Sequence, residues 1–290
     1  MKYSFLLIFL IFTNCTNSPT TEVARINKLK QLDIPLKKPV AGEWLFEHNE
    51  TGQTYEAYQK LSLAKPNDSL SVIYIQPIGS FTEGEQKIIQ FTTEYVSVFF
   101  NLKTVVLNPL SEALIPAKYR RMNDGVEQLR THYIMDSLLN EVPKDALATM
   151  AITAKDLYPS DAWNFVFGEA NIEKRKAVSS LFRYADAEND SLNQIICLER
   201  IIKTSVHEIG HMFSCLHCTH AECVMNGSNH LPESDSKPNA LCSECLKKLS
   251  ELLSFDNKKR MTELKAFYKK HNLARDYTRA SAALHILETN

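Results

Sequence analysis

Histidine and cysteine are concentrated in one short segment of this chain. Residues 207–245 read HEIGHMFSCLHCTHAECVMNGSNHLPESDSKPNALCSEC, and they contain five of the nine histidines and five of the seven cysteines of the 290-residue sequence. Imidazole and thiolate groups are ligands that zinc commonly takes in proteins. The segment therefore predicts zinc binding, and it requires a fold in which these side chains converge.

The first group of candidate ligands is an HExxH motif made by His207, Glu208 and His211. Positions i and i+4 of a helix lie on the same face, so the two imidazoles can hold one metal ion. Glu208 is placed to hydrogen-bond a water molecule on that ion and to accept its proton as general base. His217 follows at the spacing of the longer pattern HExxHxxGxxH, and it supplies a third ligand if the helix ends near residue 214.

The longer pattern has glycine at the turn after the helix, where this chain has Ser214. A residue with a side chain adopts the left-handed turn conformation at a cost of about 1–2 kcal/mol, which is small beside a zinc site worth on the order of 10 kcal/mol. Three histidines leave the fourth coordination position open, as in catalytic zinc sites. Met225 is expected to pack beneath the metal as a Met-turn, or as an ordinary core residue.

The second group of candidate ligands has the spacing C-x4-C-x18-C-x2-C and consists of Cys218, Cys223, Cys242 and Cys245. This spacing suits a closed, structural zinc site with four thiolates. Two disulfides are the alternative if the chain is exported, but we favour zinc because bound metal protects thiolates. The other cysteines and histidines near these motifs are expected to pack in the core or lie at the surface: Cys197, Cys215, His220 and His230.

Taken as one string, the histidine, methionine and cysteine pattern resembles that of the archaemetzincins, a family of zinc peptidases in the metzincin clan. Three upstream segments also resemble this family: SVIYIQPIG at 71–79, RTHY at 130–133 and ITAKDLYPSDAWNFVFG at 152–168. The resemblance covers roughly residues 70–250. It departs from the family pattern at Ser214, and by about a residue in the loop between Met225 and Cys242.

The resemblance implies a zinc-dependent metallopeptidase that acts on peptides or proteins, with Glu208 as general base. It also implies two zinc ions per chain, since one catalytic ion would be held by the three histidines and one structural ion by the four cysteines. The ligands implied are His207, His211 and His217 for the first ion, and Cys218, Cys223, Cys242 and Cys245 for the second. The alternative function is a non-catalytic, zinc-stabilised binding module at the cell surface. The intact Glu208 argues against that alternative.

Composition narrows the choice of partners. The formal net charge of −1 implies no bulk attraction to nucleic acid or to an anionic membrane. The cysteine-rich segment is not strongly basic, so it does not suit a nucleic-acid-binding finger. A length of 290 residues with 44% hydrophobic content allows one catalytic domain with extensions, and we expect a monomer.

The N-terminus resembles a bacterial lipoprotein signal. Its apolar run, residues 5–12, is too short to span a bilayer as a helix, and Cys15 follows as the candidate for lipidation. Asn14 is atypical, because small residues usually precede such a cysteine. An uncleaved anchor, or a mis-set start codon and a cytoplasmic protein, are the alternatives. Because the segment resembles a lipoprotein signal, we expect the protein to be exported. We expect it to attach to the membrane only through a lipid anchor.

The domain organisation expected is a signal at 1–15, a tether and N-terminal extension at 16–45, and a metallopeptidase domain at 46–290 with its core at 70–250. The fold class expected is α/β (α+β), a metzincin-like zincin fold with a mixed twisted sheet and a smaller zinc-stapled C-terminal subdomain. Hydrophobic periodicity predicts strands at 70–77, 102–107, 148–153, 165–168 and 177–182. It predicts helices at 23–31, 83–99, 123–140, 195–213 and 243–272. Residues 164–168 are the candidate edge strand above the cleft, beside Trp163 and Phe165.

Overall fold

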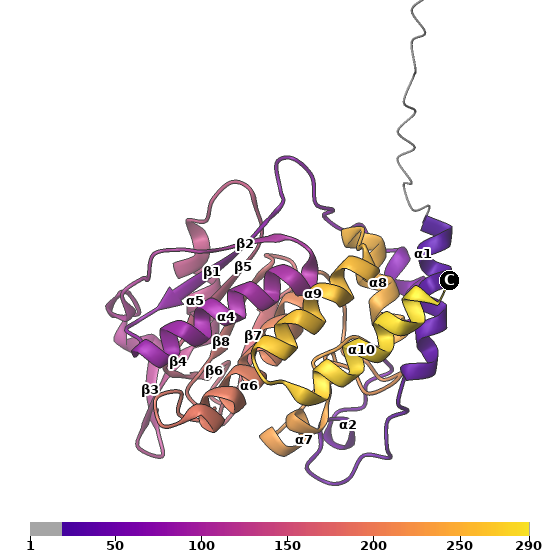
Figure 1. Ribbon diagram of the computed structural model, residues 1–290. Helices are drawn as coiled ribbons and strands as arrows, with labels where there is room; N and C mark the ends of the chain where they lie inside the picture. The colour runs from indigo at the N-terminus through magenta and orange to yellow at the C-terminus, as the bar shows by residue number, and fades with distance from the viewer. Residues whose placement is uncertain (1–18, 290) are drawn as a thin grey trace, which may run out of the picture.

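The computed structural model describes residues 19–289 and has a mixed α/β fold (Figure 1). Its main sheet has five strands in the order β2-β1-β5-β8-β7. In chain order these strands are β1 (Val72–Ile78), β2 (Lys103–Val106), β5 (Ala146–Thr153), β7 (Gly168–Asn171) and β8 (Lys176–Ser180). Strands β2, β1, β5 and β8 are parallel, whereas β7 runs antiparallel to β8 at one edge. The predicted fold class with a mixed sheet is confirmed.

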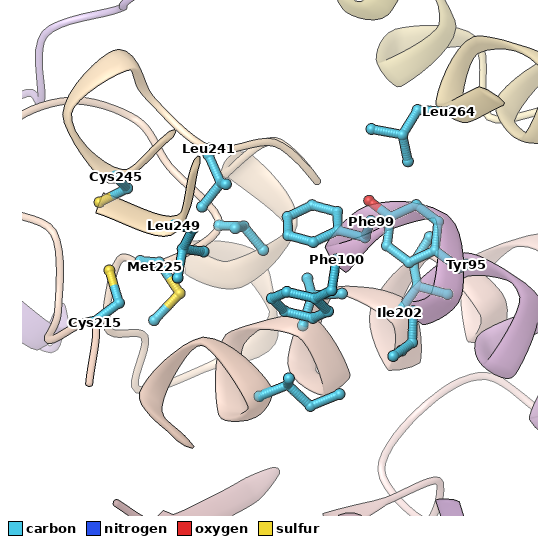
Figure 2. Packing of buried hydrophobic residues seen from close by; sticks show 14 of the residues in the cluster. Tyr95, Phe99, Phe100, Ile202, Cys215, Met225, Leu241, Cys245, Leu249 and Leu264 are labelled. Atoms are coloured by element: carbon cyan, nitrogen blue, oxygen red, sulfur yellow. The ribbon is translucent and has the colours of Figure 1, made fainter. Parts of the chain in front are cut away.

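Two long helices, α4 (Glu83–Phe100) and α6 (Ser191–Met212), pack against each other and on the same face of this sheet. Helix α4 begins at a capping box in which Thr82 and Glu85 satisfy free backbone amides of the first turn. Figure 2 shows the buried aromatic side chains of α4 beside Ile202 of α6. These aromatic residues form the centre of the main core: Tyr95, Phe99 and Phe100.

The opposite face of the main sheet is covered by α5 (Thr131–Asp136) and by a smaller sheet. The smaller sheet consists of β3 (Arg120–Asn123), β4 (Val126–Arg130) and β6 (Asp156–Tyr158). A second buried cluster fills this side, and it includes Val178 of β8 and Leu157 of β6. The central strands β1 and β5 are therefore buried on both faces, which explains their nearly continuous apolar sequences, whereas the edge strand β2 is partly exposed.

The predicted helix at 123–140 is wrong in its first half. Residues 120–130 form a β-hairpin, and helix begins only at Thr131. The reason is the pair Asp124 and Gly125, which both have positive φ, 49° and 78°. An Asp-Gly pair in this conformation forms the tight turn that suits two antiparallel strands, and it overrides the helical spacing of the apolar residues.

The edge strand was also predicted a few residues too early. Of the predicted strand 165–168, Val166 forms an isolated bridge to Leu157, and Gly168 is already the first residue of the actual edge strand, β7. Strand β7 pairs with β8 through Gly168 and the residues after it. The chain therefore reaches the sheet edge at Gly168.

The C-terminal part is helical and lies beside α4 (Figure 1). It contains α7 (Leu231–Ser236), α8 (Ser243–Leu253), α9 (Asn257–Lys270) and α10 (Ala274–Glu288), of which α10 lies beyond the predicted helical segment. The remaining short helices are α2 (Trp44–Glu47), α3 (Tyr55–Gln59) and the 3-10 turns Glu112–Leu114, Ala117–Tyr119 and Leu138–Asn140. Among residues 19–289, no helix is both long and apolar enough to cross a membrane.

The N-terminal extension packs on these C-terminal helices, and so its described part is not a free tether. Helix α1 (Pro19–Lys28) and the 3-10 turn Leu29–Leu32 contact α8 and α10, and Ile26 is only 1% exposed. Asp33 accepts hydrogen bonds from the backbone amide and the hydroxyl of Ser243, at the start of α8. The signal segment and Cys15 lie outside the described residues, so lipidation and export stay predictions.

Truncating Ile26 should measure how much this docking stabilises the protein. We expect Ile26→Ala to lower the free energy of unfolding by about 2–5 kcal/mol, because it leaves a cavity in the core. Ile34→Ala is the matched control, since Ile34 is 47% exposed and should change the value by less than about 0.5 kcal/mol. Denaturant unfolding of the zinc-loaded protein gives both values. Equal values for the two variants would show that the extension is not docked.

Candidate metal centres and active-site cleft

The three predicted histidines converge at the C-terminal end of α6. Their candidate ligand atoms all lie within 4.8 Å of one another. His207 and His211 come from successive turns of the helix, with 3.0 Å between their Nε2 atoms. The ring of His217 lies 5.2 Å from that of His207 and 4.9 Å from that of His211, between centroids. The arrangement fits three ligands around a single metal ion.

Backbone carbonyls fix the two helical imidazoles in the tautomer that a metal needs. Nδ1 of His207 donates to the carbonyl of Val224 at 2.8 Å, and Nδ1 of His211 donates to the carbonyl of Cys215 at 2.7 Å. The proton is therefore on Nδ1, and the Nε2 lone pair of each ring is left for a metal. Burial, together with the other histidines, lowers the pKa of His207 well below its usual value and that of His211 to about 3. Both rings are accordingly neutral, as metal ligation requires.

The helix ends as the ligand spacing requires. Ser214 adopts the predicted left-handed conformation, with φ of 61°, and its amide donates to the carbonyl of His211 at 2.7 Å. The side chain of Gln53 spans the turn, since it donates to the carbonyl of Ser214 at 3.0 Å and accepts from the amide of Leu216 at 3.3 Å. A side chain from a distant segment thus holds the turn that lacks the usual glycine.

Glu50 is a functional residue that the sequence analysis missed. Its carboxylate accepts from Nδ1 of His217 at 2.9 Å, which fixes the third imidazole as the carbonyls fix the other two. Trp44 contacts the same ring edge-on, with 5.0 Å between centroids. The segment 44–53 therefore supports the third histidine from outside the motif. A glutamate in an irregular loop carries no sequence signal for such a role.

Glu208 is buried beneath the edge strand. Burial, and next the charge of Glu169, raises the pKa of its carboxyl well above the usual value. A Cβ on Gly168 would lie 2.8 Å from Oε1 of Glu208, so only glycine lets β7 begin this close to the carboxylate. No residue from 19 to 289 donates a hydrogen bond to it, and its side chain lines the cleft. The carboxylate is thus left without a protein partner next to the histidines.

Met225 packs under the metal-binding helix. It is fully buried, and a Cβ on Gly210, between the two helical histidines, would lie 2.5 Å from its Sδ. Its carbonyl accepts from the amide of Cys218 at 2.8 Å. Figure 2 shows its thioether at the end of the main core nearest the cysteines. Met225 therefore packs against Gly210 on the helix that carries His207 and His211, and its role as a Met-turn stays a prediction.

The four predicted cysteine ligands also converge. The sulfur atoms of Cys218, Cys223, Cys242 and Cys245 all lie within 4.8 Å of one another, and those of Cys218 and Cys242 are 3.6 Å apart. This distance is far longer than the roughly 2.05 Å of a disulfide bond, and all four are free thiols. Zinc–sulfur bonds of about 2.3 Å in a tetrahedron give sulfur–sulfur distances of this size. The cluster fits one metal ion better than two disulfides.

The backbone around this cluster suits thiolates. The amides of Met225 and Cys242 donate to the sulfur of Cys223 at 3.5 Å and 3.3 Å. The side chain of Asn226 accepts from the amide of Cys223 at 2.7 Å and donates to the carbonyl of Cys218 at 2.7 Å, which closes the loop between these cysteines. Burial alone raises the pKa of the Cys223 thiol and so favours its protonated form. A bound zinc ion would have the opposite effect, because it favours the thiolate.

The remaining candidates stay outside both groups, as predicted. Cys197 and Cys215 are buried in the core. His220 lies at the surface, 3.6 Å from Asp33, and His230 accepts a hydrogen bond at the start of α7.

A cleft of about 530 Å³ runs past the three histidines and Glu208. On one side it is lined by Gly168 and Glu169 of β7 and by Trp163 and Phe165, which precede that strand. Trp163 is 39% exposed. Trp163 and Phe165, beside the candidate edge strand, therefore line the cleft, whereas Asp156 is a structural residue that is paired with Arg183 at 2.6 Å.

Residues 110–251 match the model of peptidase family M54. Archaemetzincin-2 of Rattus norvegicus is 31% identical over 259 residues, which cover 77% of this chain and 71% of that protein. The chain belongs to the archaemetzincin family, a family of zinc metallopeptidases. Archaemetzincin of Thermococcus kodakarensis is 35% identical over 193 residues, which cover 62% of this chain and 96% of that protein.

Among solved structures, archaemetzincin from Methanopyrus kandleri is similar with a TM-score of 0.52 and 26% identity. The match covers 66% of this chain and 99% of that one. Nearly the whole of that shorter archaemetzincin therefore corresponds to part of this fold, and about a third of this archaemetzincin lies outside the match.

Removing the carboxylate of Glu50 should weaken metal binding at the histidines. We expect Glu50→Ala to lower zinc affinity there by roughly 10- to 100-fold, because His217 loses the group that orients it. Glu56→Ala, which removes an exposed glutamate on α3, is the control and should leave the affinity unchanged. Competition with a zinc chelator measures both, and equal affinities would remove Glu50 from the site.

Proposed function

We propose that this archaemetzincin hydrolyses peptide bonds in the cleft, with His207, His211 and His217 as zinc ligands and Glu208 as general base. The observation that carries the proposal is the position of the Glu208 carboxylate, which is buried, lines the cleft beside three convergent histidines and has no hydrogen-bond partner among residues 19–289. A zinc ion held there supplies Lewis-acid chemistry, because it polarises a carbonyl and acidifies water.

Glu208 can carry out both proton transfers that hydrolysis of a peptide bond requires. Desolvation raises the proton affinity of Glu208, so its carboxylate can accept a proton from the attacking water. The protonated carboxyl can then pass that proton to the leaving amine. The hydrogen bonds from the three imidazoles to Val224, Cys215 and Glu50 keep these rings in place during both steps.

Strand β7 supports binding of an extended peptide. It lies at the sheet edge, and no strand within residues 19–289 pairs with its outer side. Its residues Gly168 and Glu169 line the cleft. A substrate can add to this edge through main-chain hydrogen bonds, which hold a peptide with little dependence on its sequence.

We further propose that the four cysteines hold a second, structural zinc ion. The support is their burial and mutual distances, together with the amides that donate to Cys223. Two zinc ions per chain follow. The alternative, a binding module without catalysis, would be favoured if Ser214 in place of glycine distorted the turn before His217. The hydrogen bonds between Gln53 and that turn argue against such a distortion.

Replacing Glu208 should separate metal binding from catalysis. We expect Glu208→Gln to keep its zinc and to lower peptide hydrolysis by about 100-fold or more, because the amide cannot accept the proton. Hydrolysis of a fluorogenic peptide library, with zinc content measured on the same samples, tests this. Hydrolysis at the parent rate by a zinc-loaded variant would exclude Glu208 as general base.

Counting metal ions tests the two-site proposal. We expect about two zinc ions in the parent chain, and about one in His211→Ala, because the variant loses one of three ligands at the open site and keeps all four thiolates. Elemental mass spectrometry of protein without residues 1–15 measures both. One zinc ion in each protein would mean that the histidine site does not hold zinc, and would favour the binding module.

A further inference from the structure

The lining of the cleft is partly basic. Lys203 lies on α6 four residues before His207, so the two side chains share one face of the helix, separated by about 6 Å along its axis. Lys203 and Lys237 both line the cleft, together with Ser234 of α7. Two lysines therefore line the same cleft as the histidines, and Lys203 lies on the side toward the start of α6.

Among residues 19–289, Lys203 is a buried ammonium group with no carboxylate in direct contact. The residue is only 4% exposed. Its Nζ donates one hydrogen bond, to the carbonyl of Ser234 at 2.8 Å, although an ammonium group has three donors. Within the described part of the chain, no carboxylate oxygen lies within 4.0 Å of it. A neutral carbonyl leaves the charge uncompensated, and burying such a charge is unfavourable unless an anion joins it.

The charge is present at neutral pH. Burial, and next the charge of Arg275, lowers the pKa of Lys203 to about 8. Three more distant carboxylates act in the opposite direction: Glu199, Asp276 and Asp235. Most Lys203 side chains are accordingly protonated at pH 7.

Lys237 adds a second positive charge that its neighbours compensate only weakly. Its Nζ lies 3.9 Å from Oε1 of Glu233. The carboxylate of Glu233 is already occupied, because it accepts from the amide of Trp44 at 3.0 Å and from the amide of Asn229 at 2.8 Å.

The lining of the cleft also includes two carboxylates, and one of them, Glu169, is paired with His132 at 3.0 Å. The other is Glu208, at which the charge of Glu169 is felt. A bound anion would be repelled from these carboxylates and attracted to the lysines. Charge can therefore orient a substrate within the cleft.

We propose that Lys203 and Lys237 form a subsite for a carboxylate group of the substrate, which is either an acidic side chain close to the cleaved bond or the C-terminal carboxylate of a peptide. The proposal rests on the proposed peptidase function, because it assigns a substrate class to the same cleft. The alternative is that Lys203 only holds α7 in place through its hydrogen bond to Ser234. In that case charged and neutral peptides would bind equally well.

Peptide binding tests the subsite without relying on turnover. Zinc-loaded Glu208→Gln protein is titrated with blocked alanine-rich octapeptides that carry one Glu, or one Gln, at successive positions. A second arm compares peptides with a free and an amidated C-terminus. Isothermal titration measures the dissociation constants, and the series is repeated with Lys203→Gln, which keeps a donor for Ser234, and with Lys237→Met.

We expect the carboxylate form to bind about tenfold or more tightly than its neutral partner at one position or at the C-terminus, because charge-assisted hydrogen bonds exceed neutral ones. A preference for Glu over Gln would identify an acidic side chain as the ligand of the subsite. A preference for the free over the amidated C-terminus would identify the terminal carboxylate. The preference should fall to about twofold or less in Lys203→Gln, as its charge is lost, and persist in Lys259→Gln, which removes an exposed lysine on α9. The Lys237→Met variant should lose part of it.

The outcomes separate the two proposals. Equal binding of charged and neutral peptides, in both arms and at every position, overturns the subsite and leaves the peptidase function standing. A preference that persists in both Lys203→Gln and Lys237→Met also overturns it, because another group would then bind the carboxylate. Failure of every peptide to bind overturns the peptidase function and the subsite together.

Discussion

One peptide bond joins the two candidate metal centres, because His217 and Cys218 are neighbours in the chain. Any tightening of the four-cysteine cluster therefore restricts the third histidine. The amide of Cys218 is held by the carbonyl of Met225 at 2.8 Å, and its carbonyl is held by Asn226 at 2.7 Å. Cys218, the residue after His217, is thus held by hydrogen bonds at both its amide and its carbonyl. A structural zinc ion at the cysteines would stabilise the geometry of the catalytic site, although it lies outside the cleft.

A second constraint on His217 comes from residues 44–53, which precede the predicted core at 70–250. Glu50 orients the imidazole and Gln53 holds the turn at Ser214, so the departure from glycine is accommodated by hydrogen bonds from a distant segment. The same segment is anchored at its other end, where the amide of Trp44 donates to Glu233. Trp44 also lies so close to Gly227 that a Cβ there would meet its ring at 2.4 Å. The extension is therefore part of the wall of the cleft.

The ligand groups were predictable from sequence because spacing along a helix or a short loop determines which side chains can meet. The four-residue step between His207 and His211 is such a case, and the long apolar strands are another. Glu50 was not predictable, since its contact with His217 joins residues 167 positions apart and its loop has no periodicity. The helix predicted over 123–140 failed for a different reason, because a two-residue turn at Asp124 and Gly125 outweighs the apolar spacing around it.

Burial changes the proton affinity of two charged groups that line the cleft, because it removes water from the Glu208 carboxylate and from the Lys203 ammonium group. Desolvation makes Glu208 a stronger base than an exposed carboxylate. At Lys203 the same desolvation acts on an ammonium group that no carboxylate within residues 19–289 contacts directly, so its charge is available to the ligand proposed above. An edge strand such as β7 selects weakly among peptide sequences, since it binds the main chain. Selectivity in such a cleft must then come from side-chain subsites, and a buried ammonium group one helical turn from the metal ligands is the strongest source of selectivity that these residues provide.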